Sequence, residues 1–285
     1  MGIDTDLYYI YNIITMKKII IPVFCLLVTF CLLAVTGCSY FSTDDEITYK
    51  DVEGGKALSR YEGNSSHDSL VIPAEVDGQP VVEISDYAVA ASEYLKTITI
   101  GKNVKKISYR AFCGTCKNLS AYVVDESNPY FCTVDGVIFN KEKTVLVAYP
   151  NKRAGDEYVI PDGVTTIASC AFYMCDNLKK VTFPATVTKV EDFAFFKCGG
   201  LEHIELNEGL KEVGHDGFSF TEGLLELHLP STLEKIGDYG FYAKTSKISS
   251  FTTKRKIEDI DCGKSWRPQT TGMENSALTP SYVGE

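Results

Sequence analysis

The strongest constraint on this chain is an apolar pattern that recurs every 23 residues. Its aliphatic member recurs at Ile167, Val190, Val213 and Ile236, and its aromatic member at Phe172, Phe195, Phe218 and Phe241. A fixed period of about 20 to 50 residues is typical of repeat proteins. One unit buries too few large apolar side chains to offset the entropy of ordering it, so neighbouring units must stabilise one another by stacking.

The same phase persists upstream and is interrupted once. Ile84 and Ile107 are again 23 residues apart, but the step from Ile107 to Ile167 is 60 residues. Residues 121–157 are therefore predicted to form one enlarged coil. Within it, the segment Val134–Val137 has the Asp-Gly centre of a two-residue hairpin turn. We expect a small meander that protrudes from the stack.

Each repeat predicts a strand, a second short strand and then a turn around the aromatic residue. Parallel strands of successive coils stack about 4.8 Å apart, and their crossovers are right-handed in nearly all known cases. The expected fold is mostly β: a right-handed solenoid of about seven coils, with short turns or 3-10 segments on its outer side.

The repeat also resembles a known family. Ile167–Leu178 reads Ile-Ala-Ser-Cys-Ala-Phe-Tyr-Met-Cys-Asp-Asn-Leu, and Val190–Leu201 and Ile107–Leu119 repeat it. This resembles the Ile-Gly-x-x-Ala-Phe-x-x-Cys-x-x-Leu signature of BspA-like leucine-rich repeat proteins. Val213–Leu224 departs from it, with Thr221 in place of the Cys. The resemblance implies a leucine-rich-repeat solenoid used for adhesion or protein binding, with a host or neighbouring-cell protein as ligand and no cofactor.

Period, composition and resemblance together suggest an organisation along the chain. The expected segments are a signal peptide (1–37), a lipidated Cys with an acidic tether (38–46), an N-terminal capping segment (47–69), the solenoid (70–247) and a degenerate C-terminal tail (248–285). The period fails beyond Lys244, and the polar end of the tail is expected to be frayed.

The segment ending at Cys38 resembles a bacterial lipoprotein signal. Met16-Lys17-Lys18 supplies a basic start, and the apolar run 19–33 is shorter than the roughly 20 residues of a membrane span. Small residues then lead into Cys38, whose lipidation the resemblance implies. Residues 1–15 contain acidic side chains that do not suit a leader, so they are predicted to be a mis-assigned start.

The acidic cluster Asp44-Asp45-Glu46 follows the Cys. It is similar to the surface-export signal of some Gram-negative anaerobes. We therefore expect a lipid anchor in the bacterial outer membrane or at the cell surface, with a periplasm-facing position as the alternative. The net charge of −10 argues against a nucleic-acid partner.

The cysteines predict packing rather than chemistry. Cys116, Cys175 and Cys198 share one repeat column, which indicates small buried turn residues. Cys113 and Cys116 form one CxxC string with no second copy, so a redox or zinc site is disfavoured. Stacked Cys175 and Cys198 are expected to approach disulfide distance. Cys132, Cys170 and Cys262 show no obvious pairing.

Outward positions on the predicted strands form the candidate binding face. Its members are Thr97, Thr99, Lys180, Thr182, His203, Glu205, Glu226 and His228. In register, His203 lies beside Glu226 and Glu205 beside His228. Two imidazoles and two carboxylates are potential ligands of a divalent transition metal. Complementary cross-strand pairs are the favoured interpretation, so no metal site is assigned.

Two other features leave alternatives open. Tyr173, Phe196 and Tyr242 follow the repeat aromatic and form a column broken by Ser219. Such a stripe indicates either packing or an interface anchor. A glycan-binding or structural cell-envelope protein is therefore the alternative function. Enzyme motifs are missing from the sequence, and an active site would have to lie in the enlarged coil, between residues 122 and 149.

Overall fold

The computed structural model describes residues 46–63, 67–89, 92–113, 118–269 and 277–283. They belong to one compact unit, Phe41–Glu285. The predicted signal segment and Cys38 lie outside the described residues. The described part is almost entirely β, and its one helical element is the 3-10 turn η1 (Ile257–Asp259). No helix in this part is long and apolar enough to cross a membrane.

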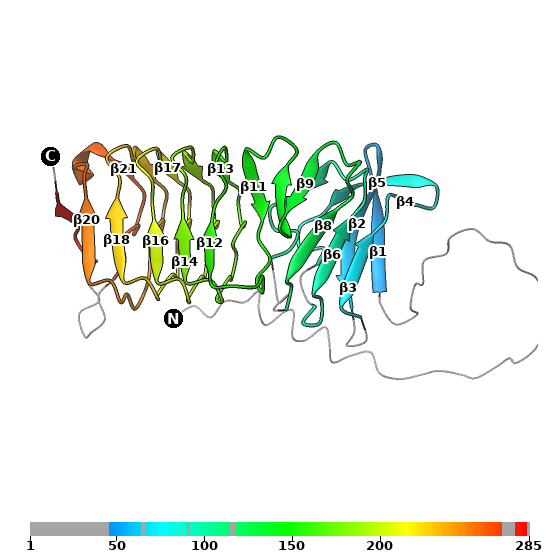
Figure 1. Cartoon of the computed structure of the whole chain (residues 1–285), viewed down its shortest axis with the longest axis horizontal. Coiled ribbons are helices and arrows are strands. Elements are labelled where there is room, and N and C mark those ends of the chain that lie inside the picture. Colours follow the sequence, from blue (N-terminus) through cyan, green and yellow to red (C-terminus); the bar gives the residue numbers. More distant parts are fainter. Residues whose placement is uncertain (1–45, 64–66, 90–91, 114–117, 270–276, 284–285) are drawn as a thin grey trace, which may run out of the picture. The chain divides into compact units, whose positions relative to one another are not determined.

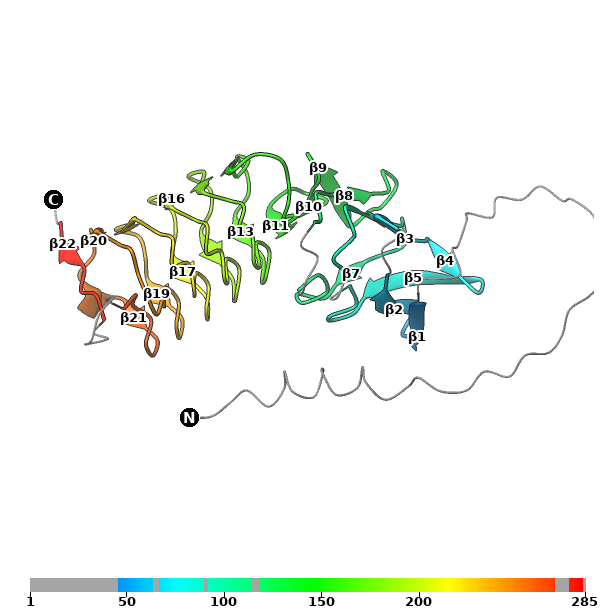
Figure 2. The same cartoon turned by 90° about the horizontal axis from the view of Figure 1, so that it is seen from below.

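The second half of the fold is a stack of regular coils (Figure 1). Its longer strands are β12 (Glu157–Val159), β14 (Lys180–Thr182), β16 (His203–Glu205), β18 (Glu226–Leu229) and β20 (Ser250–Thr253). Its short strands are β13 (Thr166–Ile167), β15 (Lys189–Val190), β17 (Glu212–Val213), β19 (Lys235–Ile236) and β21 (Asp261–Cys262). Figure 2 shows these two sets on separate sides of each coil. Val181 pairs with Ile204, and Val190 with Val213, in parallel. The 23-residue period is confirmed as the ladder register.

Both strand sets point their aliphatic side chains into one continuous core. Ile167, Val190, Val213 and Ile236 are at most 1% exposed. The repeat aromatics stack between the sheets: ring centroids are 4.5 Å apart for Phe172–Phe195, 4.8 Å for Phe195–Phe218 and 5.0 Å for Phe218–Phe241. Because each ring is covered by the ring of the next coil, the core depends on stacking rather than on any single unit.

The first half has its own strands and its own core. β1 (Glu46–Val52) and β2 (Gly55–Glu62) form an antiparallel hairpin, and β2 pairs in parallel with β5 (Gln79–Ile84). The strands that complete this half are β3 (Ser69–Ile72), β4 (Glu75–Val76), β6 (Thr97–Ile100), β7 (Lys106–Ile107) and β8 (Ala121–Val124). β3, β6 and β8 form a parallel sheet separate from the sheet of β12, β14 and β16.

The enlarged coil contains a meander of β9 (Phe131–Val134), β10 (Val137–Asn140) and β11 (Val145–Ala148). Its β9–β10 turn has φ of 49° at Asp135 and 79° at Gly136, as the Asp-Gly pair predicts. The expectation that the meander protrudes is wrong. Ile138 is buried in the first core, and Val137 and Phe139 are buried in the second. Neighbouring apolar side chains on both faces of β10 need cover, and a place between two cores provides it.

The predicted end of the solenoid at residue 247 is also wrong. β20 pairs with β18 and β21 with β19, so both ladders continue through one more coil. Register partners there are 24 residues apart (Glu226–Ser250) and 26 apart (Lys235–Asp261), which hides the coil from a search at 23. β22 (Ser281–Tyr282) then pairs with β20, so part of the predicted frayed tail is ordered.

Candidate functional site

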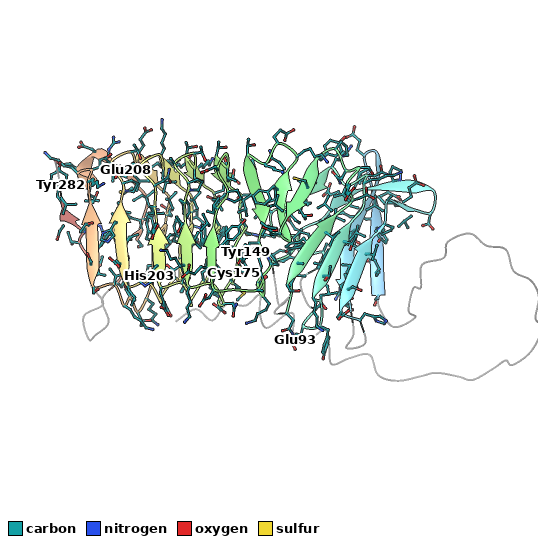
Figure 3. The ribbon with its side chains drawn as sticks, in the orientation of Figure 1. Glu93, Tyr149, Cys175, His203, Glu208 and Tyr282 are labelled. Atoms are coloured by element: carbon teal, nitrogen blue, oxygen red, sulfur yellow. The ribbon has the colours of Figure 1, made fainter. Side chains whose placement is uncertain are left out.

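The outward residues of β14, β16, β18 and β20 form a polar network that we call the strand face. Glu205 Oε1 lies 2.6 Å from Lys180 Nζ, and Thr182 donates to the same carboxylate at 3.4 Å. The Lys180 ammonium is the main cause of a lowered pKa for Glu205. His203 Nδ1 lies 3.8 Å from Glu226. Figure 3 labels His203 on this side of the coils.

The strand face extends by one strand beyond the predicted residues. His228 Nε2 lies 3.0 Å from Glu226 Oε2, and its Nδ1 lies 2.7 Å from the hydroxyl of Thr252. Thr252 was missed because it belongs to the coil whose spacing departs from 23. Lys180, His203, Glu205, Glu226 and His228 each keep 36–57% of their side chains exposed. These groups can therefore hydrogen-bond to a partner.

Thr97 and Thr99 lie in a different sheet from the other six predicted residues. On β6 they are half-exposed, and Thr99 pairs with Val71 on one side and Val123 on the other. Val71 is 55% and Val123 45% exposed. The outward row of β3–β6–β8 is therefore uncharged and β-branched. The sequence signal for it was a Val at alternate, outward strand positions.

The four residues considered for a metal ion pair in a different way. Glu205 turns to Lys180, whereas Glu226 serves both His203 and His228. Among residues with described placement, no group of three or more His, Cys, Asp or Glu side chains is arranged to hold a metal ion.

Aromatic side chains form a ridge on the turns that follow the short strands. We define the aromatic ridge as Tyr173, Phe193, Phe196, His215, Phe220, Tyr239 and Tyr242. Tyr173 stacks on Phe196 with centroids 5.4 Å apart. Phe220 meets Phe196 at 5.4 Å and Tyr242 at 5.6 Å. The break expected at Ser219 is therefore filled by the next residue, Phe220.

A cavity of about 240 Å³ lies where the coil of Ile107 meets the coil of Ile167. Its walls include Phe112, Tyr122, Phe131 and Tyr149. Tyr149 also begins the aromatic stack, 4.8 Å from Phe172, and is labelled in Figure 3 near Cys175. The meander creates this cavity because it widens the step between the two coils.

The polar groups of the cavity are engaged with one another. The carboxylate of Glu191 accepts from both the backbone N–H and the hydroxyl of Ser169 at 3.1 Å. Asn151 Nδ2 donates to the carbonyl of Tyr173 at 3.2 Å. No histidine is among its described lining residues. This arrangement favours a structural role over a catalytic one.

The described cysteines are free thiols. Cys198 Sγ donates to the carbonyl of Phe172 at 2.9 Å, and burial raises its pKa to about 12. Thr221, which replaces the column Cys, donates to Phe218 O at 2.8 Å. The column thus supplies a small side chain that donates to a backbone carbonyl inside the stack. Cys116 lies outside the described residues.

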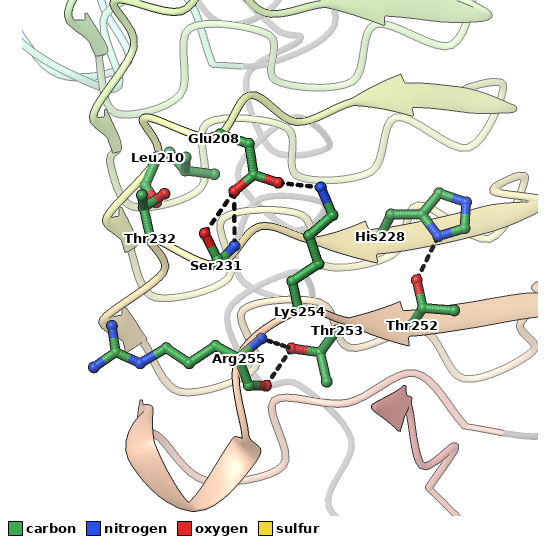
Figure 4. Close-up of polar contacts among 9 residues, drawn as sticks. All are labelled: Glu208, Leu210, His228, Ser231, Thr232, Thr252, Thr253, Lys254 and Arg255. Carbon is green, nitrogen blue, oxygen red and sulfur yellow. Dashed lines mark hydrogen bonds and ion pairs between the residues drawn. The ribbon is translucent and has the colours of Figure 1, made fainter. Parts of the chain in front are cut away.

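The last coil is held by side chains that reach across the stack (Figure 4). Glu208 Oε2 accepts from the hydroxyl of Ser231 at 2.8 Å and from its N–H at 2.9 Å, while Oε1 lies 2.6 Å from Lys254 Nζ. Arg255 N donates to Thr253 Oγ1 at 3.1 Å. These contacts fasten β20 to the two preceding coils.

Comparison with known proteins agrees with this architecture. A model of the BspA-type leucine-rich repeat region matches in six copies, over residues 61–133 and 148–263. The chain belongs to the BspA-type leucine-rich repeat family. The match extends through β21, consistent with the additional coil. Family membership indicates a repeat-mediated binding role and gives no indication of catalysis.

Two solved structures share the fold. A leucine-rich cell surface protein from Faecalibacterium prausnitzii aligns at 19% identity with a TM-score of 0.52, covering 74% of this chain and 61% of that one. A leucine-rich repeat protein from Eubacterium ventriosum aligns at 21% identity with a TM-score of 0.50, covering 74% and 67%. The chain thus spans about three fifths of the Faecalibacterium protein. No curated protein matches it.

Proposed function

We propose that this protein binds another protein at the cell surface through its outward strand rows. The observation that carries the proposal is the composition of those rows. Exposed Val71 and Val123 flank Thr99 in the first half, and charged side chains line β14, β16 and β18 in the second. A partner can thus bury apolar surface at one end and pair charges at the other.

The stacked coils favour this use because they fix the rows before a partner arrives. Parallel ladders hold Lys180 beside His203 and Thr182 beside Glu205. A preorganised face loses less conformational freedom on binding than a flexible one. The host or a neighbouring cell is the proposed source of the partner.

The test is a pull-down with the purified chain against host matrix proteins and envelope extracts, followed by binding measurements on variants. The double variant Glu205→Lys/Glu226→Lys reverses two exposed charges on the strand face. Lys211→Glu/Lys235→Glu is the matched control, since Lys211 and Lys235 are also exposed but lie on the short-strand side.

We expect the strand-face variant to weaken binding at least tenfold and the control variant to bind as the original does. Both should keep the original melting temperature, because exposed ion pairs contribute little to stability. Unchanged binding by the strand-face variant, or equal loss in both, would exclude this face. Val123→Lys extends the test to the first half, where it should weaken binding by disrupting the apolar row.

Glycan binding is a second candidate, favoured by the aromatic ridge. Tyr239 keeps 39% of its surface exposed, and exposed aromatic rings can stack on apolar faces of sugars. Tyr173 is a poorer platform, since burial raises its pKa to about 12. Glycan-array binding that is lost in Tyr239→Ala and retained in the strand-face variant would support this function over protein adhesion.

We also propose that lipidation of Cys38 holds the protein at the outer membrane. The sequence pattern supports this, and Cys38→Ala tests it: the variant should leave the membrane fraction and lose incorporation of labelled fatty acid. Protease treatment of intact cells then distinguishes a surface position from a periplasmic one. Retention of Cys38→Ala in the membrane fraction would exclude this anchor.

A further inference from the structure

Two cysteines from different coils meet at the junction between the two halves. Cys113 follows the repeat aromatic Phe112, and Cys170 lies two residues before the repeat aromatic Phe172. Both thiols line the 240 Å³ cavity, and both line an adjacent hollow of about 170 Å³. Their side chains are in hydrogen-bonding contact. They are therefore neighbours although 57 positions separate them.

The backbone explains how Cys170 comes to this place. Its φ of 59° is left-handed, as are the φ angles of 58° at Phe193 and Tyr239, which occupy the same repeat position. The corresponding position in the coil of Ile107 is Arg110, which lines the smaller hollow together with both thiols. Its guanidinium lies 5.7 Å from the ring centroid of Phe193. A nearby fixed positive charge favours the thiolate form of a cysteine.

We propose that Cys113 and Cys170 form a disulfide by exchange with a small-molecule disulfide. The bond would join the coil of Ile107 to the coil of Ile167 at the place where regular strand pairing stops, because β7 pairs with β5 and the long ladder of short strands begins at the meander. Nothing else in the described chain links these two coils covalently apart from the meander itself.

The exchange has a defined order. Cys170 is half-exposed, whereas Cys113 is 6% exposed, so Cys170 meets the reagent first. Its thiolate attacks one sulfur of the small disulfide, forms a mixed disulfide and releases one thiol. Cys113 then loses its proton and attacks Cys170 Sγ, releasing the second thiol. Two protein thiols are oxidised, and one small disulfide is reduced to two thiols.

The environment of Cys113 fits the second step. Hydrogen bonding to Cys170 and burial raise the pKa of its thiol. A thiol of high pKa is a poor first nucleophile at neutral pH, but inside a mixed disulfide its proximity to the target sulfur compensates. Reaction should therefore be slow at neutral pH and faster at alkaline pH.

The test equilibrates the full chain with mixtures of oxidised and reduced glutathione, alkylates free thiols, digests with trypsin and maps crosslinks by mass spectrometry. A tryptic peptide carrying Cys113 also carries Cys116, so the variant Cys116→Ser is mapped in parallel. We expect a Cys113–Cys170 crosslink in the original chain and in Cys116→Ser, and none in Cys170→Ser. A crosslink that persists in Cys170→Ser, pairing of Cys113 with Cys116 instead, or no crosslink at any glutathione ratio would overturn the proposal.

A thermal measurement checks that the bond joins the halves. The oxidised chain should melt on the order of 5 °C above the reduced chain, because the crosslink closes a long loop. Cys132→Ser, which removes a half-exposed thiol on the meander, should keep this difference, and Cys170→Ser should lose it. Equal melting of the crosslinked and reduced chains would show that the bond does not tie the coils together.

Discussion

Glu208 and Lys254 meet across two coils of the solenoid, with Oε1 2.6 Å from Nζ. The 46 residues between them are two full periods. Hydrogen bonding to Lys254 is the main cause of a lowered pKa for Glu208, and Ser231 lowers it further. One carboxylate thus helps to fasten the irregular last coil to two regular ones.

Glu208 should make the stability of the last coil dependent on pH. A carboxyl whose pKa is lower in the folded state stabilises it above the unfolded pKa, near 4.5, and this contribution is lost as pH falls through the lower folded value. Glu208→Gln should weaken amide-exchange protection of β20 by up to about 1 kcal/mol at pH 7, since the carboxylate is half-exposed. The difference from the original chain should shrink below pH 4.5; a constant difference would contradict this linkage.

Phe195 should be among the most costly core positions. It is fully buried between the rings of Phe172 and Phe218. Phe195→Ala removes both ring contacts and leaves a cavity, so we expect urea unfolding to show a loss of about 3–5 kcal/mol. Tyr94→Ala, which truncates a 46% exposed ring, is the control and should change stability by less than about 0.5 kcal/mol. Similar losses in the two variants would argue against the stacked core.

Gly237 should tolerate no side chain. A Cβ there would lie 2.6 Å from the backbone of both Gly214 and His215 in the preceding coil. Gly237→Ala must therefore push two coils apart, and we expect a loss of about 1–3 kcal/mol in chemical denaturation. Gly199→Ala is the matched control, because its Cβ would make only an ordinary 3.5 Å contact with Asp176. The prediction fails if the control is as destabilised as Gly237→Ala.

Trp266 should report on the last coil alone. It is the single Trp of the chain, is 5% exposed and packs edge-on against Phe251 with centroids 6.2 Å apart. Its fluorescence should be poorly quenched by acrylamide in the native state. In urea, its transition should precede the circular-dichroism transition, because a coil near the end of a stack has fewer stabilising neighbours. Coincident midpoints would show that the last coil unfolds with the rest.

The repeat register was predictable because stacking leaves a direct trace in the sequence. Every ladder pair from β13 to β19 is separated by the period that Ile167, Val190, Val213 and Ile236 display. Where spacing drifts, the trace disappears: Trp266 follows Phe241 by 25 residues, and so its coil was missed. The strand pairing recognises backbone geometry and tolerates such insertions in the turns.

Contacts between different columns were not predictable. The period relates a residue to its equivalents, but Cys113 and Cys170 are not equivalent positions, so no spacing argument places them together. The burial of Ile138 was missed for a related reason, because it depends on a gap between two cores. The exposed Val71 and Val123 could have been found from strand alternation, since they occupy outward positions.

The meander also has a mechanical consequence. Along each half, a pull parallel to the stacking axis is resisted by hydrogen bonds in every coil. At the wedge of β9 and β10, the halves are linked instead by side-chain packing and by isolated bonds such as Tyr122 N–H to Gly136 O at 2.9 Å. A protein tethered at one end and loaded by a partner at the other would yield first at this point, which makes the wedge its built-in tear line.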